Sequence, residues 1–239
     1  MTWSIVARDA AGNFGVAVAS KFFAVGALCI HTRRAVGALS TQALMNPLYG
    51  PACLDLLARG ATAAEAVAAV VGPDAGRAQR QLHVLGAAGA GAAHTGINCV
   101  DWCGHQLHDD FSVAGNMLVG EAVVAATAQA FVASSGLPLA ERLLAAMAAG
   151  EAAGGDKRGR QSAALRIHAD EDYPQLDMRV DDHGQPIVEL QRLYQVSLQR
   201  FQPFVSCLAG RHDAAGLIDR ALIDARIAQF LAQHSGSPG

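Results

Sequence analysis

Charged residues are scarce in this sequence, and their distribution excludes several classes of partner. Asp, Glu, Lys and Arg together make up 16% of the residues, and the formal net charge is −3. The sequence contains no basic stripe that could follow a nucleic-acid backbone and no acidic tail. We therefore expect no nucleic-acid partner.

Long apolar runs are also missing. The most apolar helix candidate, residues 119–133, contains Glu121 and Gln129 and is shorter than the roughly 20 apolar residues that a membrane span needs. The first residues have no cationic start, and Arg8 and Asp9 interrupt the apolar run, so we expect no signal peptide. The sequence predicts a cytoplasmic protein without a membrane partner.

Cysteine is present in an odd number, which is typical of reduced thiols rather than of a disulfide framework when no export signal is found. Cys99, Cys103, His105 and His108 are residue types that bind zinc, but their spacing is not a strong zinc signature. Residues 177–183 hold three Asp residues and one His, which form a second candidate metal site.

A simpler interpretation of that acidic group is structural. Asp177 and Arg179 alternate onto one face of a strand and could form an ion pair, while Asp181 and Asp182 precede a helix and favour its positive end. We therefore predict no metal and no cofactor.

Apolar residues account for 51% of the chain, enough for a large core. Alternating apolar and polar residues, bounded by turn residues, predict strands. Apolar residues that recur every three to four positions predict helices, and these helices come in pairs. Expected strands are residues 3–8, 14–20, 25–30, 35–40, 81–85, 91–95, 111–114, 161–168 and 177–180. Expected helices are residues 47–59, 62–71, 117–133, 139–149 and 186–201, with one or two more in the tail.

Because strands pair as hairpins and helices come in pairs, the pattern is not an alternating parallel one. It predicts an α/β protein of the α+β type, a four-layer αββα sandwich in which two mainly antiparallel sheets lie between helices. We expect one such domain over residues 1–200 and a helical extension over residues 201–239, with a frayed end.

Seven segments, in the same order, resemble a bacterial family named domain of unknown function 1028. They are TWSIVARD at 2–9, GVAVASKFFAVG at 15–26, STQA at 40–43, NPLYG at 46–50, GNML at 115–118, GDKRGRQSAA at 155–164 and DMRVDDH at 177–183. The resemblance covers about residues 2–195. It implies a fold grouped with the N-terminal-nucleophile (Ntn) hydrolases, which agrees with the expected layers.

This resemblance makes Thr2 the candidate nucleophile. In Ntn hydrolases the first residue of the mature chain attacks, and its own α-amino group acts as the base. Thr2 becomes that residue if Met1 is removed. Ser20 and Lys21 end the second strand, where the superfamily often has an Asp and a basic residue, and Arg33 is another candidate cation. Each could equally be an ordinary strand-end or turn residue.

Two further segments carry polar residues at strand ends. Thr41 and Gln42 could line a pocket, while Asn46 could serve only as a helix N-cap. Gly115 permits close approach of the backbone, and Asn116 could donate to an oxyanion or cap a helix. We predict that Thr2, Ser20, Thr41 and Asn116 meet at one end of the sheets.

The loop of residues 156–161 holds three cations near two glycines. Lys157, Arg158 and Arg160, with Asp156 and Gln161, could bind a carboxylate or phosphate, or could form a solvated loop. The segment lacks the ending of a P-loop.

The sequence thus predicts a hydrolase that cleaves an amide or related C–N bond of a small, anionic metabolite. The alternative is a small-molecule-binding protein that keeps the fold without the chemistry. The small-molecule substrate is the expected partner, and the Ala-rich helices suggest a homodimer.

Overall fold

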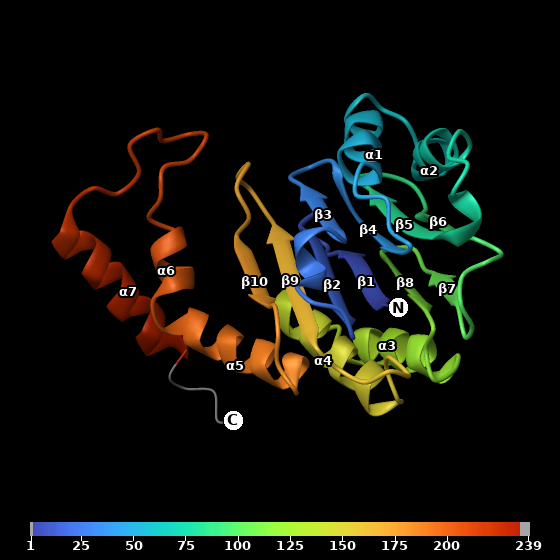
Figure 1. Cartoon of the computed structure of the whole chain (residues 1–239). Coiled ribbons are helices and arrows are strands. Elements are labelled where there is room, and N and C mark those ends of the chain that lie inside the picture. The colour runs from blue at the N-terminus through green and yellow to red at the C-terminus, as the bar shows by residue number, and fades with distance from the viewer. Residues whose placement is uncertain (1, 235–239) are drawn as a thin grey trace. The chain divides into compact units, whose positions relative to one another are not determined.

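Two antiparallel sheets form the centre of the protein, whose computed structural model describes residues 2–234 (Figure 1). The larger sheet has the order β10-β9-β2-β1-β8-β7 and the smaller one β3-β4-β5-β6. The strands are β1 (Thr2–Arg8), β2 (Phe14–Ser20), β3 (Ile30–Arg33), β4 (Gly37–Ala43), β5 (Arg80–Gly86), β6 (Ala92–Thr95), β7 (Gly104–Leu107), β8 (Phe111–Asn116), β9 (Ser162–His168) and β10 (Leu176–Val180).

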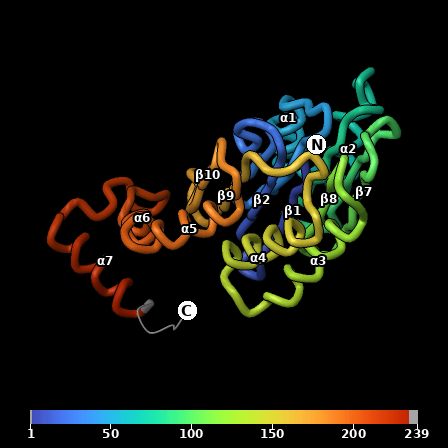
Figure 2. The backbone as a smooth tube through the Cα atoms, turned by 60° about the horizontal axis from the view of Figure 1, so that its bottom comes forward, coloured from blue at the N-terminus to red at the C-terminus, as the bar shows by residue number. Residues whose placement is uncertain are grey.

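Helices cover the outer faces of both sheets (Figures 1 and 2). Helices α1 (Tyr49–Ala58) and α2 (Ala63–Val71) pack on the smaller sheet, and α3 (Ala122–Ala133) and α4 (Leu139–Ala152) pack side by side on the larger one. The later helices are α5 (Pro186–Gln199), α6 (Phe201–Val205) and α7 (Arg220–His234). The expected α+β architecture with two antiparallel sheets is confirmed.

Two local expectations are corrected. Residues 25–27 form a short 3-10 helix rather than a strand, so the second hairpin starts later and pairs β3 with β4. Strand β7, which the sequence analysis treated only as part of a zinc candidate, pairs with β8 at the edge of the larger sheet. Its burial alternates between half-buried and exposed, so it lacks the apolar signal of an inner strand.

Helix starts follow local chemistry. Thr62 accepts a hydrogen bond from the Glu65 amide, and the Glu65 carboxylate accepts one from the Thr62 amide, which forms a capping box before α2. Asn46 accepts from the Leu48 amide through its Oδ1, and α1 begins at Tyr49 rather than at Pro47.

The space between the sheets has an apolar half. Val6, Phe14, Val16 and Val18 of the larger sheet pack there against a matching set from the smaller sheet and its neighbours. Phe14 is 1% exposed and the three valines are fully buried. This half supplies the hydrophobic contribution to sheet stacking.

The other half of that space is polar. Ser4 on β1 donates to Gln42 Oε1 on β4 at 2.8 Å, and its hydroxyl lies 2.7 Å from His83 Nε2 on β5. His83 Nδ1 lies 2.8 Å from the Ser112 hydroxyl on β8. Because these side chains are fully buried, the hydrogen bonds replace the water that each group loses on folding.

The chain divides into two compact units, Met1–Leu190 and Gln191–Gly239, whereas the sequence analysis places the division near residue 200. The sheets and α1 to α4 belong to the first unit. In the second unit Phe201, Leu222 and Leu231 expose their side chains to solvent. Within residues 2–234, no helix has both the length and the apolar character needed to cross a bilayer.

The buried position of His83 generates a prediction about acid stability. Burial lowers the pKa of His83 from 6.5 to about 3, so the folded protein keeps this imidazole neutral. Between these values the unfolded chain binds a proton that the folded protein does not, and stability falls as the pH falls. We expect a loss of up to about 1.4 kcal/mol for each pH unit.

Urea unfolding between pH 7 and pH 4 measures this loss. The variant His83→Gln removes the titration while keeping a donor and an acceptor, and should lose stability less steeply over the same range. Unfolding of the variant at pH 7 checks that it still folds. Equal slopes for the two proteins would contradict the assignment.

Candidate functional site

Thr2 lies at the start of the central strand of the larger sheet, with a neighbour on each side. In β1, Thr2 pairs with Asn116 of β8, while the adjacent Trp3 pairs with Ala19 of β2. The Thr2 hydroxyl donates to the Ser20 hydroxyl at 3.3 Å. Both side chains are buried, so the structure brings Thr2, Ser20 and Asn116 together at one end of the sheet.

The carbonyl group of Thr2 is held by two side-chain amides. Asn116 Nδ2 donates to it at 3.3 Å from the same sheet, and Gln42 Nε2 donates at 3.5 Å from the other sheet. The same two amides also donate to Gln81 Oε1, at 2.9 and 2.8 Å. Thr2 is therefore fixed by a network that bridges both sheets.

Gln81 is a member of this network that the sequence analysis missed. Its Nε2 donates to the Gly115 carbonyl at 2.8 Å and to the Thr95 hydroxyl at 2.9 Å. Gln81 and His83 stand at alternate positions of an otherwise apolar strand, so they share the face toward the other sheet. That spacing is the signal that could have identified both residues.

The loop after α4 is attached to the end of β2, beside Ser20. Asp156 is buried and accepts a hydrogen bond from the Lys21 amide at 2.7 Å and one from the Arg158 amide at 2.8 Å. The Gln161 amide donates to the Ser20 carbonyl at 3.2 Å. Asp156 therefore organises the loop, and its carboxylate is not directed at a ligand.

The cations of this loop each have a partner within the protein. Lys157 Nζ donates to the Asp101 carbonyl at 2.7 Å, and Arg158 forms an ion pair with Asp156. Arg160 forms an ion pair with Glu151, in which the nitrogen and oxygen are 3.4 Å apart. The side chains of Arg158 and Arg160 remain 41% and 49% exposed, so a ligand can still reach them.

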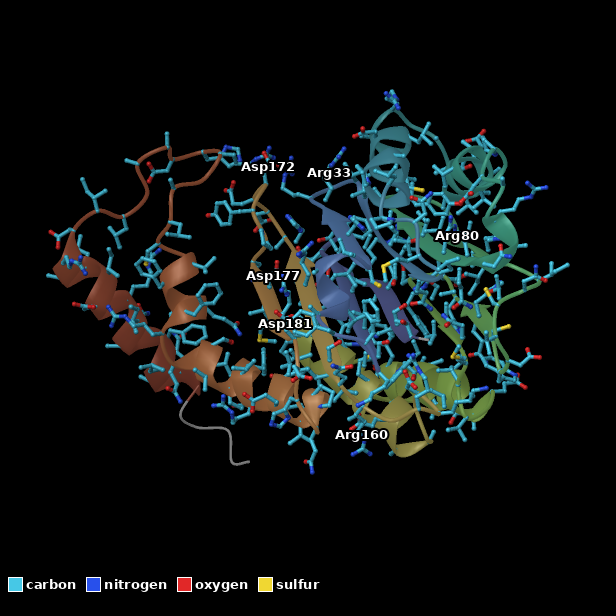
Figure 3. All side chains as sticks on the ribbon, viewed as in Figure 1. Arg33, Arg80, Arg160, Asp172, Asp177 and Asp181 are labelled. Atoms are coloured by element: carbon cyan, nitrogen blue, oxygen red, sulfur yellow. The ribbon has the colours of Figure 1, made fainter. Side chains whose placement is uncertain are left out.

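Three other candidates lie elsewhere. The Thr41 hydroxyl donates to the Asn46 carbonyl at 3.2 Å, so neither residue is directed at Thr2. Thr41 neighbours Gln42 in β4, and successive side chains of a strand point to opposite faces. Arg33 pairs with Gly37 at the other end of β4 and forms an ion pair with Asp55, far from Arg160 in Figure 3.

Gly115 allows close packing on the opposite face of the larger sheet. A Cβ atom at this position would lie 2.3 Å from Leu118 Cδ1 and 3.1 Å from Trp3 Cβ. The glycine therefore lets the end of β8 pack tightly and is not itself a ligand contact.

A small pocket opens next to Asn116. Its volume is about 250 Å³, and it lies between the ends of β4 and β8 and the segment before β7. Its lining consists of uncharged residues: Ala43, Leu44, Gln79, Asn98, Cys99, Val100, Asn116 and Met117.

Two residues of the pocket have left-handed backbone conformations. Ala43 has a φ of 66° and Met117 a φ of 56°, and each follows directly after a residue that binds the Thr2 carbonyl. Such a conformation costs a non-glycine residue about 1–2 kcal/mol. Strain of this kind persists where the surrounding structure enforces it, and it is frequent at functional sites.

The cysteines near this pocket are protonated thiols. Burial raises the pKa of Cys99, and burial together with a hydrogen bond to Asp101 raises the pKa of Cys103 to about 11. The Cys99 thiol donates to the Arg80 carbonyl, and the Cys103 thiol to the Cys99 carbonyl. Among residues 2–234 no group of three or more His, Cys, Asp or Glu side chains is placed to hold a metal ion.

The acidic group at residues 177–183 forms ion pairs, but not the expected one. Asp177 pairs with Arg166 of the neighbouring strand β9 at 2.8 Å, and Arg179 pairs with Asp181 at 2.7 Å. Residues opposite each other on neighbouring strands are closer than residues two apart in one strand, so Asp177 pairs with Arg166 instead of Arg179. Figure 3 places Asp177 and Asp181 along β10.

Comparisons with known proteins agree with this architecture. A crystal structure of protein SPO2555 from Silicibacter pomeroyi, described with the family model DUF1028, matches with a TM-score of 0.84 and 32% sequence identity. The match covers 92% of this chain and 96% of that one. Anbu, the ancestral β-subunit from Yersinia bercovieri, gives a TM-score of 0.37 at 12% identity over 82% of this chain and 94% of its own, too distant to support an inference.

A comparison with curated proteins gives no match. The family model described as "Family of unknown function (DUF1028)" matches residues 2–190, which span both sheets, helices α1 to α4 and every residue of the Thr2 network. The chain belongs to this family.

Proposed function

We propose that the protein is an Ntn-type hydrolase that cleaves an amide or related C–N bond of a small metabolite. The observation that carries the proposal is the position of Thr2. It starts the central strand, its hydroxyl faces Ser20, and its carbonyl is held by amides from both sheets. A nucleophile must be held in this way to meet its substrate in a fixed geometry.

In the proposed reaction the Thr2 hydroxyl attacks the carbonyl carbon of the substrate after removal of Met1. The free α-amino group takes the hydroxyl proton, because its ordinary pKa of about 7.7–8.0 suits a base at neutral pH. The amine then returns the proton to the leaving nitrogen as the C–N bond breaks. Water hydrolyses the resulting ester and regenerates Thr2, so the reaction uses no cofactor.

Asn116 is the proposed donor to the oxyanion of the tetrahedral intermediate. Both of its N–H groups are engaged, one with Gln81 at 2.9 Å and one with the Thr2 carbonyl at 3.3 Å. The longer bond is the weaker, and Gln42 also donates to that carbonyl. Asn116 can therefore exchange this bond for one to the oxyanion while Gln42 keeps Thr2 in place.

The anionic part of the substrate is assigned to the β2 side of Thr2. There Lys21 follows Ser20, and the loop of Arg158 and Arg160 is attached to the same strand end. Both guanidinium groups are half-exposed, so a carboxylate can add to their existing ion pairs. Cytoplasmic location and association as a homodimer remain predictions.

A non-catalytic binding protein on the same fold is the second candidate. The observation that favours it is Ser20, because the residue that accepts the Thr2 hydrogen bond is a neutral hydroxyl and not a carboxylate. A hydroxyl does not take a proton at neutral pH and carries no negative charge to balance a nearby cation.

Intact mass separates the two candidates. We expect the active protein to lack Met1, which lies outside the described residues, because a retained Met1 converts the α-amine into a non-basic amide. The measurement is mass spectrometry of purified protein alongside an activity screen over N-acyl amino acids and related amides. Full activity in protein that keeps Met1 would rule out this mechanism.

Substitution of Thr2 tests the nucleophile directly. Thr2→Ala should lower turnover by at least about 1000-fold, because the attacking oxygen is lost. Thr2→Ser should keep partial activity, since the hydroxyl and the amine both survive. The melting temperature of both variants should stay within a few degrees of the wild type, and wild-type turnover by Thr2→Ala would contradict the assignment.

Substitution of Asn116 tests the oxyanion donor. Asn116→Ala should lower kcat by about 100-fold with a small change in KM, because the lost bond forms in the transition state. Steady-state kinetics measure both constants, and the melting temperature reports on folding. An unchanged kcat in folded protein would assign Asn116 to structure alone.

A further inference from the structure

The pocket beside Asn116 carries a further inference about the substrate, which rests on the proposed function. Asn116 lines this pocket and also contacts the Thr2 carbonyl, so one side chain separates the pocket from the candidate nucleophile. The pocket lies on the β8 side of Thr2. The cationic loop is bound to the ends of both strands: Lys157 donates from Nζ to the Asp101 carbonyl beside the pocket, whereas Asp156, the ion-pair partner of Arg158, accepts from the Lys21 amide just after β2. A substrate bound across Thr2 would therefore place its two ends in different surroundings.

The pocket has no charged side chain in its lining. Leu44 and Val100 are 65% and 48% exposed at its edge, which is apolar surface that a ligand can cover. The Cys99 thiol has a raised pKa and is neutral. A charged group entering this pocket would lose part of its hydration without meeting an opposite charge in the lining, which is unfavourable.

Two carboxamides in the lining favour a polar but uncharged ligand. Within residues 2–234, the side chains of Gln79 and Asn98 make no hydrogen bond to another protein group. Several backbone groups of the lining, in contrast, are paired with each other. Leu44 donates from its amide to the Gln79 carbonyl at 3.1 Å, and Met117 donates from its amide to the Val100 carbonyl. A carboxamide both donates and accepts, so it matches a ligand group that does the same.

The size of the pocket limits the ligand. A volume of about 250 Å³ corresponds to roughly eight water molecules at their share of liquid volume, so the pocket suits a group of a few heavy atoms. Ala43 ends β4 and Met117 directly follows β8, and both line the pocket in left-handed conformations. Because both follow residues of the Thr2 network, the same hydrogen bonds help to position the pocket.

We propose that this pocket binds the acyl side of the scissile amide, and that the acyl group is short, uncharged and ends in a carboxamide or hydroxyl. The anionic part of the substrate then belongs to the leaving amine, on the side of Arg158 and Arg160. The substrate class is an amino acid, or a similar anionic amine, that carries such an N-acyl group.

The test measures binding to the Thr2→Ala variant of the full chain, which cannot turn the ligand over. Two probes of nearly equal shape are compared by protein-observed NMR titration: pentanediamide, which is neutral, and its monoacid, which carries a carboxylate at one end. We expect pentanediamide to shift the side-chain amide signals of Asn98 and Asn116. We expect the monoacid to bind at least about ten-fold more weakly.

Two further substitutions locate the binding. Val100→Trp places an indole in the pocket edge and should weaken pentanediamide binding by at least about ten-fold. Ile97→Trp is the matched control, because Ile97 precedes Val100 in the same segment, is 92% exposed and does not line the pocket. It should leave the affinity within about two-fold.

Each outcome bears on one claim. Equal or tighter binding of the monoacid, no effect of Val100→Trp, or no binding of pentanediamide would overturn the pocket assignment. If pentanediamide binds as expected but the wild type hydrolyses no N-acyl amino acid, the pocket stands and the hydrolase proposal fails. If Thr2-dependent hydrolysis prefers a charged acyl group, the hydrolase stands and the pocket assignment fails.

Discussion

Hydrogen bonds among Gln42, Gln81 and Asn116 connect the two sheets. Gln42 and Gln81 belong to one sheet and Asn116 to the other, and all three side chains are buried. A buried donor or acceptor left without a partner costs about 1–3 kcal/mol. The sheets can therefore stack in only one register, because a slip would break several of these bonds at once. The apolar half of the interface stabilises stacking without selecting a register.

This constraint is also what positions the candidate site. The amides that lock the sheets together hold the Thr2 carbonyl, and the residues that follow them, Ala43 and Met117, turn sharply to form the pocket. His83 extends the network inward through Ser4 and Ser112. Stability and site geometry thus share one set of bonds, so substitutions in the network should disturb both, whereas substitutions on the loop of Arg158 should disturb mainly binding.

The two sides of Thr2 differ in character because different elements build them. Buried Asp156 binds the loop of residues 154–161 to the end of β2, where two arginines stay half-exposed, while Lys157 of the same loop reaches across to the β8 side. On the β8 side, strand ends and a short segment enclose an uncharged pocket. This asymmetry supports the proposed orientation, in which the neutral acyl group lies in the uncharged pocket and the anionic amine lies near the arginines.

Local sequence patterns predict the layers of the fold and propose candidates for the site. Alternating strands in hairpins and paired helices were enough for the αββα architecture. The family resemblance made Thr2 a candidate, and polar residues at strand ends added Ser20, Gln42 and Asn116. The hydrogen-bond partners of these residues follow from contacts between distant strands. In the sequence, Gln81 and His83 belong to an ordinary strand, and Arg33 and Thr41 are candidates on the same footing as Gln42. Strand pairing and facing direction separate these cases, because they depend on contacts between residues far apart in the chain, which local patterns do not encode.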